Sequence, residues 1–201
     1  MFAELHRAAE RRRDALAVME DLGLIEHWSR AGRVVVVGAV AYDLVVSPDV
    51  DLEVFTDGVP GIDAGFVVAA QLAEHPRITK VRFTNALRSA DQGLYWQLRY
   101  HSDDETEWKI DVWMLADDHP GPLSTSMIEP MRRALTAESR RRILQLKEAR
   151  ARGEIMDIAS IDIYRAVLEG GVSTAAELGV FLGRDYTPAL TPWLPNSYGT
   201  T

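Results

Sequence analysis

The sequence predicts an α/β protein in which helices flank a mixed β-sheet and a helical region follows at the C-terminal end. Three observations support this fold class. Apolar residues recur at helical spacing near the N-terminus. Short runs rich in β-branched and aromatic residues follow within residues 33–115, and helical spacing of apolar residues returns after Pro122. Because strands and helices are interspersed along the first part of the chain, we expect the strands to form a sheet that packs against helices.

The first elements follow from local pattern. Residues 3–30 predict a helix that is interrupted at Gly23. The run RVVVVG at 33–38 is continuous and β-branched, which is typical of a strand buried on both faces. The stretch AVAYDL after it is too short for more than a turn or a single helical turn. A second strand, VDLEVF, is expected at 50–55, and a helix at 62–74.

The later elements begin beyond Pro76. The short polar stretch SDDETE separates two apolar runs and predicts an antiparallel hairpin. Thr136 and the Ser173-Thr174 pair are helix-start signals. The expected elements are strands at 79–83, 94–100 and 108–115, and helices at 127–135, 138–150, 158–169 and 174–182. The proline-punctuated tail from 187 is expected to be irregular. We therefore expect an α/β domain at 1–118, with the N-terminal helix included, and a helical region at 119–201 that packs on it.

Composition excludes several classes of function. The chain has 201 residues and no cysteine, which excludes disulfides, thiolate metal ligands and a cysteine nucleophile. Its net charge of −8 argues against an extended phosphate-binding track for nucleic acid. No apolar run approaches the roughly 20 residues of a membrane span, and no signal peptide is evident. A cytoplasmic protein without a membrane partner is expected.

Acidic residues alternate with apolar ones in the second strand. Asp49, Asp51 and Glu53 occupy every other position, so their side chains are expected on one face of the strand. Crowded carboxylates repel one another unless something neutralises them, and Mg²⁺ prefers such oxygen ligands. The alternative is an amphipathic strand with a solvated acidic face.

A lone carboxylate, Asp111, lies inside the apolar run WKIDVWML, where burial is costly without a partner. A metal ion shared with Asp49 and Asp51 would be a good partner. We expect Lys109 to be a poor one, on the ground that nearby strand positions share a face only at a two-residue offset. Gly38, at the end of the first strand, would let the backbone approach a phosphate closely.

These residues together resemble the polymerase-β-like nucleotidyltransferases. The pattern is Gly38-Ala39 after a strand, then Asp49-Val50-Asp51 on the next strand, then Asp111 in a later apolar strand. The resemblance covers roughly residues 33–115. It implies a nucleotidyltransferase-type sheet, an NTP co-substrate and two Mg²⁺ ions, with Asp49 and Asp51 holding the metals on the triphosphate and Asp111 sharing the second ion near the acceptor.

The chain departs from the family pattern after Gly38. The family's serine, which usually binds a terminal phosphate, is replaced by Ala39, so only the backbone N–H remains. Tyr42 and Ser47 carry nearby hydroxyls that could compensate. Glu53 is a candidate general base because its strand parity matches that of Asp51.

The leading hypothesis is a Mg²⁺-dependent enzyme that transfers a nucleoside monophosphate from an NTP to a hydroxyl of a small molecule. The resemblance extends to antibiotic-resistance enzymes that modify aminoglycosides or lincosamides, and an acidic surface would suit a cationic acceptor. Two alternatives remain: a degenerate nucleotidyltransferase-fold protein that binds without turnover, and an antitoxin or protein-modifying enzyme. A monomer or a homodimer is expected.

Overall fold

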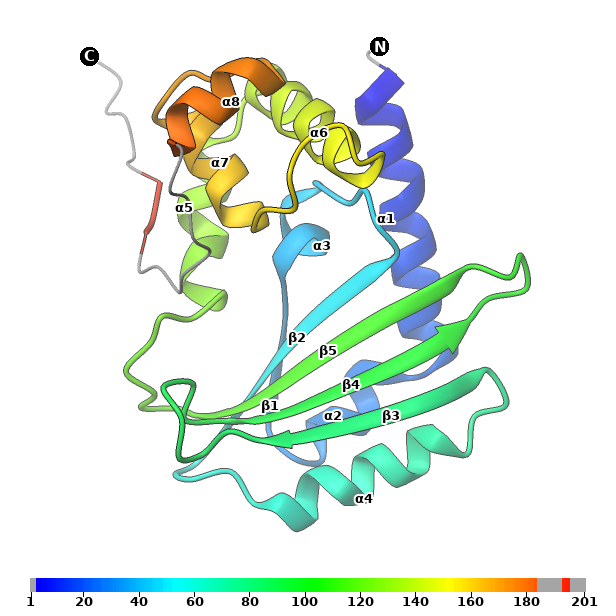
Figure 1. Cartoon of the computed structure of the whole chain (residues 1–201). Coiled ribbons are helices and arrows are strands. Elements are labelled where there is room, and N and C mark those ends of the chain that lie inside the picture. The colour runs from blue at the N-terminus through cyan, green and yellow to red at the C-terminus, as the bar shows by residue number, and fades with distance from the viewer. Residues whose placement is uncertain (1–2, 184–192, 196–201) are drawn as a thin grey trace. The chain divides into compact units, whose positions relative to one another are not determined.

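The computed structural model describes residues 3–183 and 193–195, and it has the predicted α/β class (Figure 1). A five-stranded mixed sheet is flanked by helices, as the sequence predicts. Most of the proline-punctuated tail from 187 lies outside the described residues. Within the described parts of the chain, no helix combines the length and the apolar character that a membrane crossing requires.

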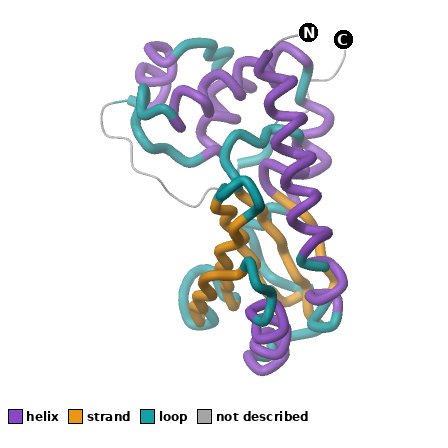
Figure 2. Tube along the Cα trace, turned by 90° about the vertical axis from the view of Figure 1, so that its right-hand side faces the viewer, coloured by secondary structure: helices purple, strands orange, loops and turns teal. Residues whose placement is uncertain are grey.

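The sheet has the strand order β1-β2-β5-β4-β3. Strand β2 pairs parallel with β5, and every other neighbouring pair is antiparallel, including the predicted hairpin of β4 and β5. Figure 2 colours these strands apart from the helices. The strands span Arg33–Val37 (β1), Asp49–Thr56 (β2), Ile78–Asn85 (β3), Leu94–His101 (β4) and Glu107–Ala116 (β5).

One prediction about the sheet is wrong. The sequence predicts that the run at 33–38 is buried on both faces, but β1 (33–37) is an edge strand in which only Val37 is buried. A β-branched run has the same sequence signature in a central strand and in an edge strand that a neighbouring layer shields in part. The short helix α3, Gly38–Tyr42, follows as the predicted single turn.

One face of the sheet carries the apolar core. Helix α2 (Leu24–Ser29) contacts β1 and helix α4 (Ile62–Ala73) contacts β3. Helix α1 (Ala3–Asp21) precedes α2, and Gly23 between them has a left-handed φ of 55°. The Trp28 ring of α2 lies 5.5 Å from the Trp96 ring of β4, and both side chains are fully buried. Phe66 of α4 contacts the same indole. Large aromatic surfaces therefore hold the helices on this face.

The C-terminal part is helical, as predicted. In the residues of this part that the structure describes, a 3-10 turn precedes four helices, of which two begin with a capping box, at Thr136 and at Thr174. Lys147 is 3% exposed and donates to the carbonyl of Leu44 at 2.6 Å. The elements are Thr125–Met127 (η1), Ile128–Ala134 (α5), Ala137–Ala151 (α6), Ser160–Leu168 (α7) and Ala175–Leu182 (α8).

Contacts divide the chain into two compact units. The sheet unit comprises Arg12–Ala41 and Pro48–Gly121, and it holds all five strands. The helical unit comprises the described parts of Met1–Arg11, Tyr42–Ser47 and Pro122–Thr201. The helix α1 thus contributes residues to both units. The sequence-based domain boundary between 118 and 119 stays a prediction.

Candidate active site

Three carboxylates meet where β2 and β5 run side by side. The parallel register places Asp51 opposite Asp111 and Asp49 opposite Lys109. One oxygen from each of Asp49, Asp51 and Asp111 lies within 4.8 Å of the other two, and all three residues are half-buried. We call these three residues the acid triad. Every member belongs to the sheet unit, so the site does not depend on the helical unit for its acidic groups.

Gly38 lies against this cluster. Its φ is +63°, a conformation that L side chains rarely adopt. A Cβ at this position would lie 2.2 Å from Oδ2 of Asp51, which is far inside van der Waals contact. A glycine is therefore favoured here for two independent reasons, backbone conformation and space beside the Asp51 carboxylate.

The other positions predicted to bind nucleotide differ in their surroundings. Ala39 is half-buried in α3, directly after Gly38. Ser47 is exposed and groups with the helical unit. Tyr42 is 3% exposed, and its hydroxyl donates to the carbonyl of Ser124 at 3.2 Å, which gives that hydroxyl a role within the helical unit. Roles for Ala39 and Ser47 in nucleotide binding stay predictions.

Asp111 is held by two polar neighbours on β4. The hydroxyl of Tyr95 donates to Oδ1 of Asp111 at 2.7 Å, and the amide of Gln97 donates to the same oxygen at 3.2 Å. The Gln97 amide also donates to the Tyr95 hydroxyl at 2.9 Å. Burial and the hydrogen bond to the Asp111 carboxylate raise the pKa of Tyr95 to about 12, so its proton stays available for this bond.

Lys109 contradicts the prediction that it would be a poor partner for Asp111. Its ammonium donates to Oδ2 of Asp111 at 2.8 Å and lies 3.2 Å from Oδ2 of Asp49. Residues 109 and 111 are two positions apart on β5, and side chains two positions apart on a strand point to the same face of the sheet. Burial alone would lower the pKa of Lys109, but the Asp111 hydrogen bond and the charges of the acid triad outweigh it and raise that pKa.

Glu53 does not join the triad. It lies opposite Trp113 on β5 and Val35 on β1, and it is 4% exposed. Among the described residues, the only group of carboxylate, histidine or cysteine side chains close enough to share a metal ion is the acid triad. The role of Glu53 as a general base stays a prediction.

The acid triad fits a hard divalent cation. It offers carboxylate oxygens, which Mg²⁺ prefers, and the missing Cβ of Gly38 leaves room beside one of them. The position of the Lys109 ammonium indicates that the cluster attracts positive charge. Tyr95 and Gln97 orient Asp111 as outer partners orient metal-binding carboxylates in other proteins.

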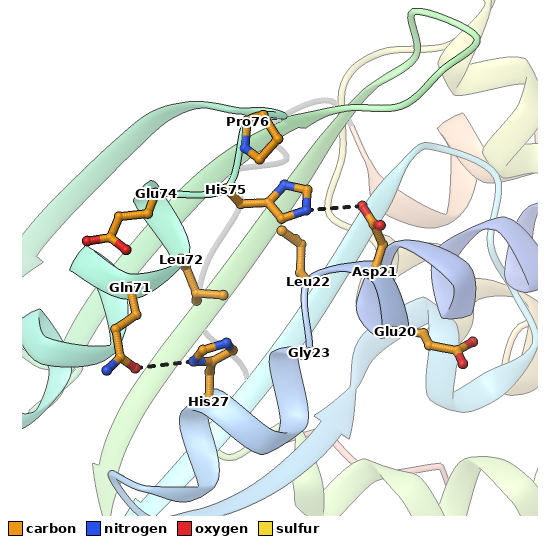
Figure 3. A pocket seen from close by; sticks show the side chains of 10 residues that line it. All are labelled: Glu20, Asp21, Leu22, Gly23, His27, Gln71, Leu72, Glu74, His75 and Pro76. Atoms are coloured by element: carbon orange, nitrogen blue, oxygen red, sulfur yellow. Dashed lines mark hydrogen bonds and ion pairs between the residues drawn. The ribbon is translucent and has the colours of Figure 1, made fainter.

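A separate depression of about 480 Å³ lies in the sheet unit near the turn between α1 and α2 (Figure 3). His27 faces Gln71 across it, with Nδ1 and Oε1 3.2 Å apart, and His75 Nε2 lies 3.5 Å from Oδ2 of Asp21. No member of the acid triad lines this depression. The two histidines are already engaged by neighbours, so we do not assign the candidate active site to it.

Sequence reasoning missed Tyr95, Gln97 and Lys109. The parity of β5 could have identified Lys109, because it needs only the assumption that 108–115 is a strand. Tyr95 and Gln97 reach Asp111 through the hairpin register, which pairs Gln97 with Asp111 and Tyr95 with Trp113. That register depends on the conformation of the SDDETE turn, for which the sequence gives no strong signal.

Comparison with known proteins supports the fold. A scan against protein-family models finds no match, and a search of curated proteins finds no relative. Solved structures of the Cid1 poly(U) polymerase do match, and three of them are complexes with MgATP, with MgGTP and with the short product ApU. The MgATP complex has a TM-score of 0.60 at 15% identity, covering 79% of this chain and 50% of that chain.

The other two matches are similar in extent. The MgGTP complex has a TM-score of 0.57 at 17% identity, and the ApU complex has 0.57 at 14% identity. Coverage is 79% of this chain in both, with 50% and 48% of the matched chains. The protein therefore spans about half the length of these structures. Identities this low show the fold alone, and the predicted resemblance to polymerase-β-like nucleotidyltransferases is confirmed at that level.

Proposed function

We propose that the protein is a Mg²⁺-dependent nucleotidyltransferase that transfers a nucleoside monophosphate from an NTP to an acceptor hydroxyl. The observation that carries this proposal is the convergence of Asp49, Asp51 and Asp111 within 4.8 Å beside the backbone of Gly38. The fold supports it, and so do the Mg²⁺-nucleotide complexes of its structural neighbours.

The proposed reaction is an in-line displacement. The acceptor oxygen forms a bond to the α-phosphorus, the bond from that phosphorus to the bridging oxygen of the β-phosphate breaks, and pyrophosphate leaves. Asp49 and Asp51 would hold two Mg²⁺ ions on the triphosphate, and Asp111 would share the second ion near the acceptor. The bound metal supplies charge neutralisation for the phosphates and lowers the pKa of the acceptor hydroxyl.

The residues of the chain contribute positioning and proton transfer. Tyr95 and Gln97 fix the carboxylate of Asp111, so that it is oriented before the acceptor arrives. The side chain of Asp111 is 15% exposed and half-buried, whereas Glu53 as a whole is 4% exposed and buried. We therefore propose that Asp111 accepts the acceptor's proton. Glu53, two positions beyond Asp51 on the same strand, is retained as a second candidate general base.

For the acceptor we propose a small hydroxylated molecule. An aminoglycoside-like or lincosamide-like antibiotic is one candidate, supported by the net charge of −8, which would attract a cation. The structural neighbour Cid1 has RNA terminal uridylyl transferase activity, and this makes an RNA end a second candidate. A cytoplasmic location and a monomeric or homodimeric state stay predictions.

A second candidate function is binding without turnover. Two observations favour it. Ala39 removes the hydroxyl that the family uses on the terminal phosphate, and the ammonium of Lys109 already bridges two carboxylates of the triad. The complete acid triad argues against it. The antitoxin or protein-modifying alternative stays a prediction.

The experiment that tests the proposal is isothermal titration of ATP, GTP, CTP and UTP with Mg²⁺. The variants are Asp49→Asn/Asp51→Asn and Asp111→Asn, with Asp57→Asn as the control, because Asp57 is an exposed acid just beyond β2. We expect the double variant to weaken Mg²⁺-NTP binding by about 100-fold or more and the control to bind like wild type.

Two outcomes separate the candidate functions. If Asp111→Asn still binds Mg²⁺-NTP, and the wild type alone releases pyrophosphate with a hydroxylated acceptor, transfer is supported over binding without turnover. If the wild type and the double variant bind the nucleotides equally, the metal-dependent proposal is refuted. Mass spectrometry of the products identifies a polypeptide acceptor if the nucleotide is found on a protein.

A further inference from the structure

The face of the sheet that carries the acid triad continues onto β4 and β3. Cross-strand partners share a face, so the register of the sheet defines which side chains lie in line with the triad. The two rows that contain the triad run from β2 through β5 and β4 to β3. They are Asp51, Asp111, Gln97 and Arg82 in one row, and Asp49, Lys109, Arg99 and Lys80 in the other.

Charge changes sign along these rows. The β2–β5 half holds the triad with one lysine, whereas the β4–β3 half holds Arg99, Arg82 and Lys80. Within the described part of the chain, Lys80 and Arg82 are exposed and have neither an ion pair nor a hydrogen bond. Arg99 is half-buried and pairs with Glu107 at 3.2 Å. We call these three basic residues, Arg82 from the first row and Arg99 and Lys80 from the second, the basic row.

An alternative interpretation of the basic row is protection of an edge strand, since charged side chains on an edge strand oppose its pairing with a strand of another chain. That role would be met by charge of either sign on the face of β3 that does not pack against α4. Here the protein has a net charge of −8, yet all three charges on the open face of β3 and β4 named above are positive. Edge protection alone does not account for that choice.

An aromatic pair lies on the same face in the adjoining row. Trp113 of β5 is opposite Tyr95 of β4, with ring centroids 4.9 Å apart and an interplanar angle of 36°. Both residues are half-buried, so neither is fully enclosed by the protein. Such a pair offers a stacking surface for a planar ring, and stacking beside positive charge is how proteins hold single nucleotides and strand ends.

We propose that the basic row binds a phosphate of the acceptor, so that the acceptor is a phosphate-bearing hydroxyl compound of nucleotide type and not a polycation. Neighbouring strands lie about 4.8 Å apart, which puts the Cα of Arg82 roughly 10 Å from that of Asp111. A side chain as long as arginine spans much of that gap. An acceptor whose hydroxyl is at Asp111 would therefore present its own phosphate to Arg82 and Lys80. This inference rests on the proposed function and narrows its acceptor.

The test measures acceptor binding without NTP, by fluorescence anisotropy of a labelled short single-stranded RNA and by competition with a mononucleotide and with an aminoglycoside. The test variant is Lys80→Ala/Arg82→Ala. The control, Arg13→Ala/Arg30→Ala, makes the same change in net charge on α1 and at the C-cap of α2. Thermal unfolding of both variants checks that they are folded.

We expect the test variant to weaken RNA binding on the order of tenfold and to reduce the slope of log Kd against log salt by about 1.4, with the control unchanged. If the mononucleotide displaces the labelled RNA as well as unlabelled RNA does at the same phosphate concentration, the acceptor is a small phosphate compound. If it does not, the acceptor is a strand end. Either result supports the inference.

The inference is overturned if the wild type binds neither anionic probe, if both double variants weaken RNA binding equally, or if an aminoglycoside binds and the test variant binds it more tightly. These results would leave the proposed function standing, because Mg²⁺-NTP binding is measured separately with the Asp49→Asn/Asp51→Asn variant. If the affinity for Mg²⁺-NTP did not depend on the acid triad, the proposed function would instead be refuted.

Discussion

Gly38→Ala is the substitution that probes the acid triad with the least change in chemistry. It adds one methyl group and removes no charge. The added Cβ would lie 2.2 Å from Oδ2 of Asp51, whereas ordinary contact begins at 3.4 Å. The carboxylate would have to retreat by the difference, 3.4 − 2.2, or roughly 1.2 Å. Metal–oxygen distances vary by only about 0.2 Å, so a shift of this size should remove Asp51 as a ligand.

The backbone cost of the same change can be separated by a matched control. Gly58 has a φ of +72°, close to the +63° of Gly38, but a Cβ there would meet nothing within 4 Å. Each alanine should cost about 1–2 kcal/mol in the left-handed conformation, which corresponds to a fall in Tm of about 2–8 °C for a chain of this size. Gly58→Ala should therefore report backbone strain alone.

The assay is thermal unfolding with and without Mg²⁺, together with calorimetric titration of Mn²⁺. We expect both variants to lose stability without metal and only Gly38→Ala to lose the metal-induced rise in Tm. If Gly38→Ala binds the metal as the wild type does, Asp51 is not a ligand or is not confined by Gly38, and the reasoning about this site is refuted.

Three further predictions concern other parts of the sheet unit. Lys109→Met should lower stability without metal by about 2 kcal/mol, because it removes an ion pair with the triad. It should enlarge the Mg²⁺-induced rise in Tm, because the ammonium no longer competes with the metal. A rise no larger than that of the control variant Lys80→Met would contradict this. Tyr95→Phe should weaken metal binding about tenfold in calorimetric titration. The pKa of Tyr95 is about 12 in the folded protein against about 10 in the unfolded chain. The stabilisation that the Tyr95 hydroxyl contributes is therefore complete below pH 10 and is lost toward pH 12. The free energies of unfolding of wild type and Tyr95→Phe, measured in denaturant, should converge over that range, and a difference that stays constant with pH would refute this. Gly65→Ala would place a Cβ 2.2 Å from a core indole ring and should cost about 1–3 kcal/mol, whereas Gly179→Ala, with nothing within 4 Å, should not lower the Tm.

The parts of the fold that the sequence predicts well are those set by neighbouring residues. The alternation around Asp49 and Asp51 identifies both the strand and its polar face, and the capping signal at Thr136 identifies the start of α6. Gly38 was identified as a special position, although the structure gives a further reason for it, the proximity of the Asp51 carboxylate.

The parts that the sequence leaves open are set by pairing between distant segments. The parallel register that brings Asp111 opposite Asp51 joins residues 60 positions apart, and no local signal specifies it. The edge position of β1 depends likewise on which strands pair, because its composition suits both a central and an edge strand. Lys109 is different, since strand parity alone was sufficient to place it beside Asp111.

The most direct test of the central claim is anomalous diffraction from crystals soaked with Mn²⁺ and a non-hydrolysable NTP. We predict anomalous density among the carboxylates of Asp49, Asp51 and Asp111, with the triphosphate beside Gly38 and the Lys109 ammonium displaced from its present position. Density elsewhere, or a triad that stays bridged by Lys109 while nucleotide binds at another place, would contradict the assignment of this cluster as a metal-dependent nucleotidyl-transfer site.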